Sequence, residues 1–242
     1  MGLWQDRHAA TIDLDRFRGH DQYLEQAPSY DYDGMVAFLR NAGWPDRYFV
    51  EDDAFGCVTA QVNGVTVSRD LLDSMAELEF LIKATPLTER FPTRILDIGA
   101  GYGRFAHRFA VYEPNAVIVC TDPIAVSRAC CKKYLEYRGV WNCTVAAPEH
   151  VLGVFDLAVN IHSWSECTLD EVAWWIDWLW AHNVPRLFIV PHTPTLGTWS
   201  PDHGGGNGPS FRPELEKRGY RIVSEWGGPA CTPRTYQLWG LR

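Results

Sequence analysis

Glycine at every second position follows a short apolar segment that carries an acid. The segment ILDIGAGYGR, residues 95–104, contains Asp97 and then Gly99, Gly101 and Gly103. Glycine tolerates positive φ and has no side chain, so a ligand can approach the backbone closely. Asp122 ends the next apolar run, about 20 residues on, where an acid can accept hydrogen bonds from both hydroxyls of a ribose. The pattern therefore indicates a site for a nucleoside.

The spacing of the glycines separates two kinds of nucleotide site. A dinucleotide fingerprint requires G-x-G-x-x-G, which counted from Gly99 puts the third glycine at position 104. This chain has Arg104 there, and a large cation would oppose the close packing of helix on strand that the third glycine serves. The observed D-x-G-x-G-x-G resembles motif I of the class I S-adenosylmethionine-dependent methyltransferases. An NAD-dependent enzyme is the alternative.

The resemblance implies a role for each matched residue. Asp97 and the glycines at 99, 101 and 103 would surround the methionine part of S-adenosylmethionine, and Asp122 would bind its ribose. Ala147, in the segment AAPE at 146–149, would lie at the adenine. Arg104 would either bond to the methionine carboxylate or be solvated, and we favour the bond because a guanidinium pairs well with a carboxylate.

Side chains that could remove a proton follow the fourth and fifth predicted strands. The fourth ends in Asn-Ile-His162-Ser with Glu166 close behind, and the fifth ends in Pro-His192. The resemblance to the class I methyltransferases implies that these strand ends face the methyl group of the cofactor. A hydroxyl that accepts this methyl group must lose its proton. The ordinary pKa of histidine suits this step near neutrality. We predict His162 as general base, Glu166 as the group that orients it or binds an acceptor hydroxyl, and His192 as a second candidate. A histidine hydrogen-bonded in the core is the alternative for His162.

The segment after the fourth strand also resembles a narrower group, the sugar O-methyltransferases typified by the nanchangmycin-pathway enzyme. Asn160, Ser163, Trp164 and Glu166 match its pattern. The resemblance implies a saccharide hydroxyl as acceptor, for example that of a mannoside or a deoxysugar. Methylation of a phenol, a carboxylate or an amine is the enzymatic alternative. The alternative that is not an enzyme is a module that binds S-adenosylmethionine without catalysing a reaction.

Two further segments could contribute to an acceptor site. Residues 23–52 interleave rings with acids, which could cover a sugar or could form the core of this segment. The residues are Tyr23, Tyr30, Tyr32, Trp44, Tyr48 and Phe49, with Asp31, Asp33, Asp46, Glu51 and Asp52 between them. The long loop after the fifth strand carries Asp202 and His203, and loops of this length are usually lids or mobile. A divalent metal such as Mg²⁺ could acidify the acceptor hydroxyl, although no ligand spacing in the sequence demonstrates one.

A sheet is needed to position these residues, and the sequence predicts one. From Thr93 onward apolar strands alternate with helices, which indicates right-handed crossovers and a parallel sheet covered on both faces. Only a short link joins the last two strands, so the final strand must run antiparallel. We predict an α/β fold, a Rossmann-like doubly wound, mostly parallel sheet with an antiparallel final strand, as in the class I methyltransferases. A small N-terminal α+β extension, residues 1–68, would cap the acceptor site, and residues 69–242 would bind S-adenosylmethionine. In the extension, Asn63-Gly64 between alternating runs predicts a hairpin.

Composition argues against several classes of partner. The 242 residues carry a net charge of −8, with a pI of about 5.4 and no run of Lys or Arg, so nucleic acid and anionic membranes are poor partners. The amino terminus lacks the apolar core of a signal peptide, and no apolar run is long enough to span a bilayer. Seven cysteines without a CxxC pair fit reduced thiols, so we predict a cytoplasmic protein. Trp174 and Trp178, beside the core stripe of their helix, indicate a homodimer contact.

Overall fold

A seven-stranded sheet lies at the centre of the molecule, with strand order β5-β4-β3-β6-β7-β9-β8. The computed structural model describes residues 12–18, 30–85, 93–202 and 205–241. The strands are β3 (Arg94–Ile98), β4 (Val117–Thr121), β5 (Cys143–Ala146), β6 (Leu157–Ile161), β7 (Arg186–Val190), β8 (Tyr220–Trp226) and β9 (Tyr236–Leu241). The strand order reverses between β3 and β6. In open α/β sheets ligands bind beyond the carboxyl ends of the strands at such a reversal.

The direction of the strands agrees with the prediction. β3 is parallel to β4 and β6, and parallel pairing continues to β5 on one side and to β7 on the other. β9 is antiparallel to both β7 and β8. The link at 227–235 is too short for a helical crossover, so β9 returns alongside β8 and inserts next to β7. The predicted doubly wound sheet with an antiparallel final strand is confirmed.

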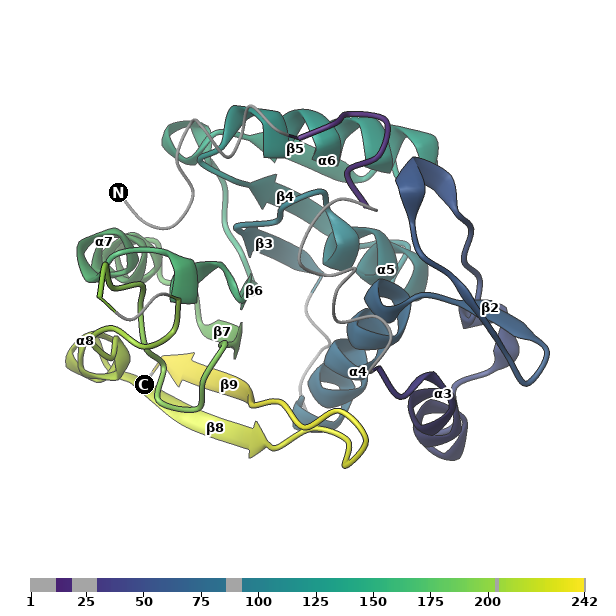
Figure 1. Cartoon of the computed structure of the whole chain (residues 1–242). Helices are drawn as coiled ribbons and strands as arrows, with labels where there is room; N and C mark the ends of the chain where they lie inside the picture. Colours follow the sequence, from purple (N-terminus) through teal and green to yellow (C-terminus); the bar gives the residue numbers. More distant parts are fainter. Residues whose placement is uncertain (1–11, 19–29, 86–92, 203–204, 242) are drawn as a thin grey trace.

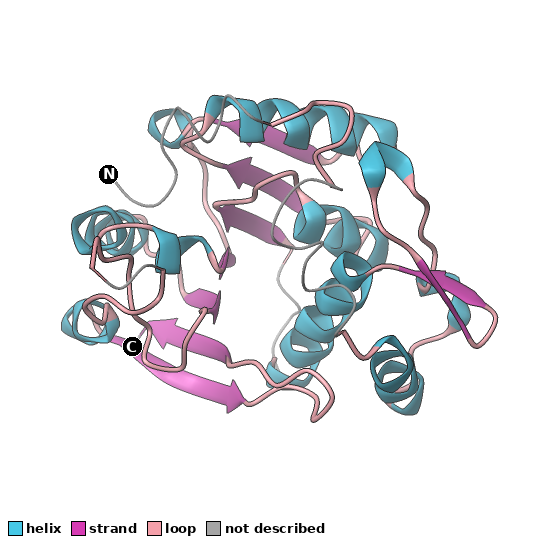
Figure 2. Cartoon of the chain, in the orientation of Figure 1, coloured by secondary structure: helices cyan, strands magenta, loops and turns pink. Residues whose placement is uncertain are grey.

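Helices cover both faces of the sheet (Figures 1 and 2). On one face lie α4 (Arg69–Ala84), α5 (Arg104–Tyr112) and α6 (Ala125–Tyr137), and on the other lie α7 (Leu169–Ala181) and α8 (Arg212–Lys217). The 3-10 helices η4 (Pro148–His150) and η5 (Ser163–Glu166) follow β5 and β6. Successive strand residues point to opposite faces, so Ile95 packs in the core on the α4 side and Leu96 in the core on the α7 side. None of the helices within the described ranges is long and apolar enough to cross a membrane.

The amino-terminal segment packs against α4. It contains α3 (Tyr32–Asn41), the 3-10 helices η2 (Asp46–Tyr48) and η3 (Ala54–Gly56), and the hairpin strands β1 (Ala60–Val62) and β2 (Val65–Val67). The predicted hairpin turn is confirmed, because Asn63 and Gly64 have φ of 47° and 85°. Trp44 and Phe49 are buried in the core shared with α4, so of the two alternatives for these rings they follow the one in which they form the core of the segment. Tyr23 lies outside the described residues, and the division of the chain at residue 68 stays a prediction.

One buried carboxylate ties this segment to the helices of the sheet. Glu51 accepts hydrogen bonds from Arg18 (2.8 Å), Arg108 (2.9 Å), Arg138 (3.1 Å) and the hydroxyl of Ser68 (2.6 Å). Burial alone would raise the pKa of Glu51, but the arginines outweigh it and hold the pKa below its ordinary value. The Ser68 hydroxyl also caps α4, so the network fixes the start of α4 relative to α5 and the end of α6.

The outer face of α7 carries the tryptophans for which a homodimer contact is predicted. Trp174 and Trp180 are 49% and 48% exposed. Trp178 is covered instead by His182, with ring centroids 3.7 Å apart. The exposed indoles are thus Trp174 and Trp180 rather than Trp174 and Trp178, and the homodimer stays a prediction.

Candidate active site

The backbone after β3 turns at the glycines and forms a cradle beside β4. The amides of Gly99 and Ala100 donate to the carbonyl of Thr121 (2.8 and 3.1 Å), and the amide of Gly101 donates to Asp122 (3.2 Å). Because φ is 70° at Gly99 and 55° at Gly101, a residue with a side chain would be strained at either position. Among the described residues, a Cβ added at Gly101 would meet no atom within 4 Å. The cradle is therefore open at its middle glycine.

Asp122 stands at the end of β4 with its carboxylate fixed by the backbone. Oδ2 accepts from Gly101, and Oδ1 accepts from the amide of Ile124 (2.8 Å). Burial raises the pKa of Asp122 to about 6, and the two amides oppose the rise. Each oxygen has a second lone pair, so the carboxylate can also accept from ribose hydroxyls. Ala147 lies at the same sheet edge, because Ala146 is paired with Thr121.

Asp97 is buried in β3, with 3% of its surface exposed. Its Oδ2 atom has no hydrogen-bond partner in the described part of the chain. Burial raises the pKa of Asp97 to about 7, because an unpaired carboxylate is unfavourable inside a protein. The ammonium group of S-adenosylmethionine would supply the missing partner. The orphaned oxygen and the open glycine cradle therefore fit this cofactor.

Arg104 is bound within the protein. Its Nη1 and Nη2 atoms donate to the two oxygens of Glu77 (2.9 Å each), and Nη1 also donates to Ser74 (2.7 Å). Glu77 is 1% exposed, so this paired fork is buried between α4 and α5. These bonds use three of the five N–H donors of the guanidinium. Arg104 therefore anchors α5 to α4, and its bond to the methionine carboxylate stays a prediction.

The turn after β6 packs directly against the cradle. Asn160 is 1% exposed, and its side-chain amide donates to the carbonyl of Ile98 (2.9 Å) and to the hydroxyl of Ser163 (2.6 Å). A Cβ on Gly99 would lie 2.0 Å from the Ser163 hydroxyl, so only glycine permits this approach. The contact places His162, which precedes η5, next to the cofactor cradle.

His162 has an unusual backbone and one bound ring nitrogen. Its φ and ψ are 67° and −34°, outside the regions that residues with a side chain favour, and such strain gathers at functional sites. Nε2 lies 3.0 Å from Nη1 of Arg234, and Nη2 of Arg234 lies 3.0 Å from Oδ2 of Asp73. Nδ1 is buried and has no partner among the described residues. Burial, together with Arg234 and His192, lowers the pKa of His162 well below its ordinary value.

Glu166 lies beside His192. Its Oε1 atom is 3.6 Å from Nε2 of His192, and the two side chains are 21% and 33% exposed. The ring of His192 is tilted against that of His162, with centroids 5.0 Å apart. Burial, followed by Arg234, lowers the pKa of His192. The prediction that Glu166 orients His162 is corrected, because the carboxylate pairs with His192 while Arg234 binds His162.

The loop after β7 folds back over His192. The amide of Gly206 donates to the carbonyl of Ser165 (2.8 Å), and Gly197 forms a bridge with Ser210. A Cβ at position 205 would lie 3.3 Å from Nδ1 of His192, so glycine at this position avoids a close contact with the ring. Asp202 is exposed, and His203 lies outside the described residues. Within the described ranges no cluster of three or more His, Cys, Asp or Glu side chains could hold a metal ion, and no residues are assigned to Mg²⁺.

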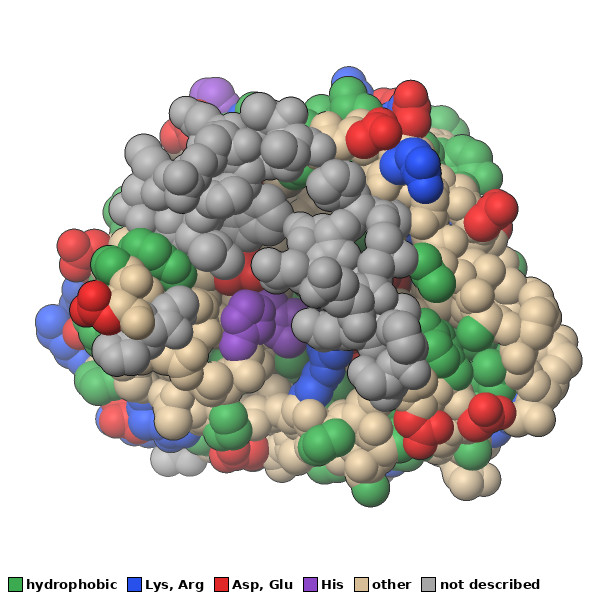
Figure 3. Space-filling model, in the orientation of Figure 1, with side chains coloured by type: hydrophobic (Ala, Val, Ile, Leu, Met, Phe, Trp, Pro, Cys, Tyr) green, Lys and Arg blue, Asp and Glu red, His purple; other side chains and the backbone are tan. Residues whose placement is uncertain are grey.

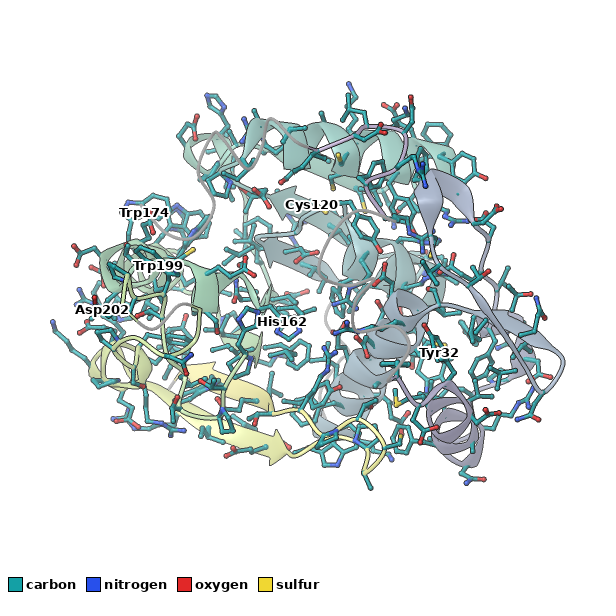
Figure 4. The ribbon with its side chains drawn as sticks, viewed as in Figure 1. Tyr32, Cys120, His162, Trp174, Trp199 and Asp202 are labelled. Carbon is teal, nitrogen blue, oxygen red and sulfur yellow. The ribbon has the colours of Figure 1, made fainter. Side chains whose placement is uncertain are left out.

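The two histidines reach the surface at the centre of one face of the molecule. Figure 3 shows histidine side chains there with a cation beside them, at the position that Figure 4 labels His162. Tyr32, the first residue of α3, which could have covered an acceptor, lies well apart from His162 in the same view. Among the described residues, the groups around His162 come from the ends of β6 and β7, from α4 and from the link before β9.

The architecture is shared with methyltransferases of known structure. No protein-family model and no curated protein sequence matches this chain. Magnesium protoporphyrin IX methyltransferase (ChlM) from Synechocystis PCC 6803, solved with bound SAM, gives a TM-score of 0.52 at 13% identity, over 92% of this chain and 98% of that one. RosA, the N,N-8-amino-8-demethyl-D-riboflavin dimethyltransferase from Streptomyces davawensis, gives 0.51 at 20% identity, over 72% and 58%. LaPhzM gives 0.52 at 13% identity, over 72% and 57%.

The chain has the class I methyltransferase fold. The strand order, the antiparallel β9 and the flanking helices all agree with it. The chain spans less than two thirds of LaPhzM and RosA, 57% and 58% of their lengths. At these identities the likeness establishes the fold, so the activity within the methyltransferase fold has to be argued from the site.

Two charged residues of the site were not predicted from the sequence. Asp73 is on α4, and Arg234 is in the link before β9, 72 positions from the His162 that it binds. Tyr30, one of the rings that could cover a sugar or form the core of its segment, donates its hydroxyl to Asp73 (2.8 Å). No sequence signal marks Arg234, because nothing in a short turn-rich link shows which distant strand end it will reach.

Proposed function

We propose that the protein is an S-adenosylmethionine-dependent O-methyltransferase that uses His192 as general base and a sugar or saccharide hydroxyl as acceptor. The observation that carries the proposal is the Glu166–His192 pair, which lies at the ends of β6 and β7 beside the glycine cradle. The cradle, Asp97 and Asp122 would hold the cofactor in the positions described above. Ala147 would lie near its adenine.

The protein has two tasks in this reaction: it must position the acceptor and remove one proton from it. When bound, S-adenosylmethionine supplies a methyl group already activated for in-line displacement. Glu166 beside Nε2 of His192 favours the tautomer that carries its proton on Nε2, which makes Nδ1 the base. The acceptor hydroxyl would give its proton to Nδ1, and Glu166 would stabilise the imidazolium that forms. Glycine at position 205 keeps a side chain away from Nδ1.

The sugar acceptor rests on the matched segment after β6. In the fold, Asn160 and Ser163 hold the turn together and Trp164 is 1% exposed. Glu166 is thus the matched residue that can meet an acceptor. A panel of saccharides, phenols, carboxylates and amines, scored by release of demethylated cofactor, tests the substrate class. Turnover of phenols alone would contradict the sugar proposal and leave the methyltransferase proposal intact.

Cofactor binding is the first measurable consequence. We expect calorimetry to detect both S-adenosylmethionine and its demethylated product, and Asp122→Ala to weaken both by about 100-fold, since charge-assisted hydrogen bonds contribute roughly 1.5–3 kcal/mol each. Asp53→Ala, at an exposed position, is the matched control and should bind normally. Absence of heat from either ligand with the unaltered protein would contradict the proposed function.

The base is tested by turnover and its pH dependence. We expect His192→Ala to lower kcat by about 10²–10⁴-fold, the usual contribution of a general base, and Glu166→Gln to lower it less. The pKa of His192 is lowered, so kcat/KM should stay level through neutral pH and fall only as pH drops through values below the ordinary histidine range. His182→Ala, on the outer surface of α7, is the control. An active His192→Ala variant beside an inactive His162→Ala variant would move the base to His162.

A further inference from the structure

One polar atom at the proposed acceptor site has no role in the proton transfer to His192. Nδ1 of His162 is buried without a hydrogen-bond partner in the described chain. Buried polar groups are nearly always paired, and an orphan in a native protein indicates a missing ligand or water. The other ring nitrogen is already bound by Arg234. The orphaned atom therefore marks a position at which something else binds.

Arg234 determines which ring nitrogen of His162 carries the proton. A guanidinium has only donors, so the 3.0 Å contact from Nη1 requires Nε2 of His162 to accept. A neutral imidazole then carries its single proton on Nδ1. Nδ1–H points away from Arg234, because the two ring nitrogens face different directions. His162 thus presents a donor, and it has no lone pair with which to take a proton.

Arg234 is itself fixed by α4. Its Nη2 atom lies 3.0 Å from Asp73, which also accepts from the hydroxyl of Tyr30 (2.8 Å) and from Arg69 (3.4 Å). Asp73 is thus held by Arg69 of the same helix and by Tyr30, which precedes α3, so the guanidinium that it binds has little freedom to turn away. The tautomer of His162 is built into the tertiary structure.

We infer that His162 is a fixed hydrogen-bond donor to an oxygen of the acceptor, with Arg234 and Asp73 as positioning residues. This inference rests on the proposed function. An oxygen with a lone pair, as in a hydroxyl or its developing alkoxide, satisfies Nδ1–H, whereas a protonated amine presents another donor and is repelled by Arg234. The site would therefore select oxygen acceptors over amines. Two adjacent rings, with centroids 5.0 Å apart, then divide the work: His192 takes the proton and His162 holds the oxygen.

The charges around His162 keep it in the neutral form. Four neighbouring groups disfavour a positive charge on the ring of His162: Arg234 in the link before β9, His192 after β7, Arg104 on α5 and Arg69 on α4. Burial acts in the same direction. A donor that does not titrate near neutrality serves across the working pH range of the enzyme.

Substitution of His162 separates a donor from a base. Asparagine tolerates positive φ and carries an amide N–H near the place of Nδ1, but it cannot take up a proton. We expect His162→Asn to keep kcat/KM within about 10-fold of the unaltered enzyme, and His162→Ala to lose about 100-fold, the effect of removing one oriented donor. An Asn variant as inactive as the Ala variant would overturn the inference. So would an amino sugar methylated as fast as the matching hydroxyl sugar.

The tautomer can be measured without cofactor or acceptor. We expect ¹⁵N–¹H spectra of the full chain, with His162 assigned from its loss in His162→Asn, to show the Nδ1–H form unchanged from about pH 6 to 8. Arg234→Met should free Nε2 and let the ring titrate, while Arg234→Lys retains a donor and should preserve the Nδ1–H form. An Nε2–H form in the unaltered protein would overturn the inference. Because calorimetry with the demethylated cofactor reports on the proposed function separately, failure of either can be told from failure of the other.

Discussion

Gly101→Ala is expected to abolish cofactor binding while leaving the protein folded. At Gly101 φ is 55°, and an added Cβ would meet no atom of the described residues within 4 Å. The fold should therefore lose only the strain of a left-handed alanine, about 1–2 kcal/mol. The empty space is where the resemblance places the methionine part of the cofactor, so the methyl group would collide with the ligand. Calorimetry should show affinity lowered by at least about 100-fold, equivalent to roughly 2.7 kcal/mol.

A glycine elsewhere provides the matched control for strain. Gly64, in the hairpin turn, also has positive φ (85°) and open space around an added Cβ. Gly64→Ala should lower the free energy of unfolding by a similar amount and leave cofactor binding intact. Equal affinity in the Gly64→Ala and Gly101→Ala variants would mean that the cofactor does not occupy the cradle.

Asp97→Asn is expected to stabilise the ligand-free protein and to weaken cofactor binding. Burial raises the pKa of Asp97 to about 7 from an ordinary 3.8. Such a shift corresponds to a ceiling of about 4 kcal/mol against the folded state at alkaline pH, and since the asparagine amide also needs partners we expect a gain of about 2 kcal/mol. The cofactor's ammonium loses an ionic partner, so its affinity should fall by about 10–100-fold. Urea unfolding and calorimetry measure the two effects.

The pH dependence of this gain has a definite sign. Because the folded pKa is raised, the wild-type carboxyl is least harmful below its ordinary pKa near 4, where it is protonated in both states. The penalty grows as pH rises from about 4 to 7 and is constant above that. The advantage of Asp97→Asn should follow the same curve, whereas Asp53→Asn, at an exposed position, should show no such trend. A pH-independent difference between Asp97→Asn and the unaltered protein would contradict the account of Asp97 as an unpaired buried acid.

The sequence by itself determined the fold class and the cofactor side of the candidate site. The glycines and Asp97 lie within one short stretch, so their spacing alone defines a strand followed by a tight turn. Asp122 could be placed because parallel strands align their carboxyl ends, and the alternation of strands and helices gave the parallel order. The short link before the final strand was enough to predict its reversal. These features depend on neighbours in the chain, and sequence patterns record them directly.

Only the tertiary structure decided which charged groups meet. Arg104 follows the glycines and was expected at the cofactor, but Glu77 of α4 binds both of its Nη atoms. Glu166 lies closer in sequence to His162, yet its carboxylate lies beside His192, and it is Arg234 from the link before β9 that binds His162. Each partner comes from an element distant in the chain. Which donor reaches which acceptor follows from how the helices and strand ends pack, and no local pattern encodes that choice.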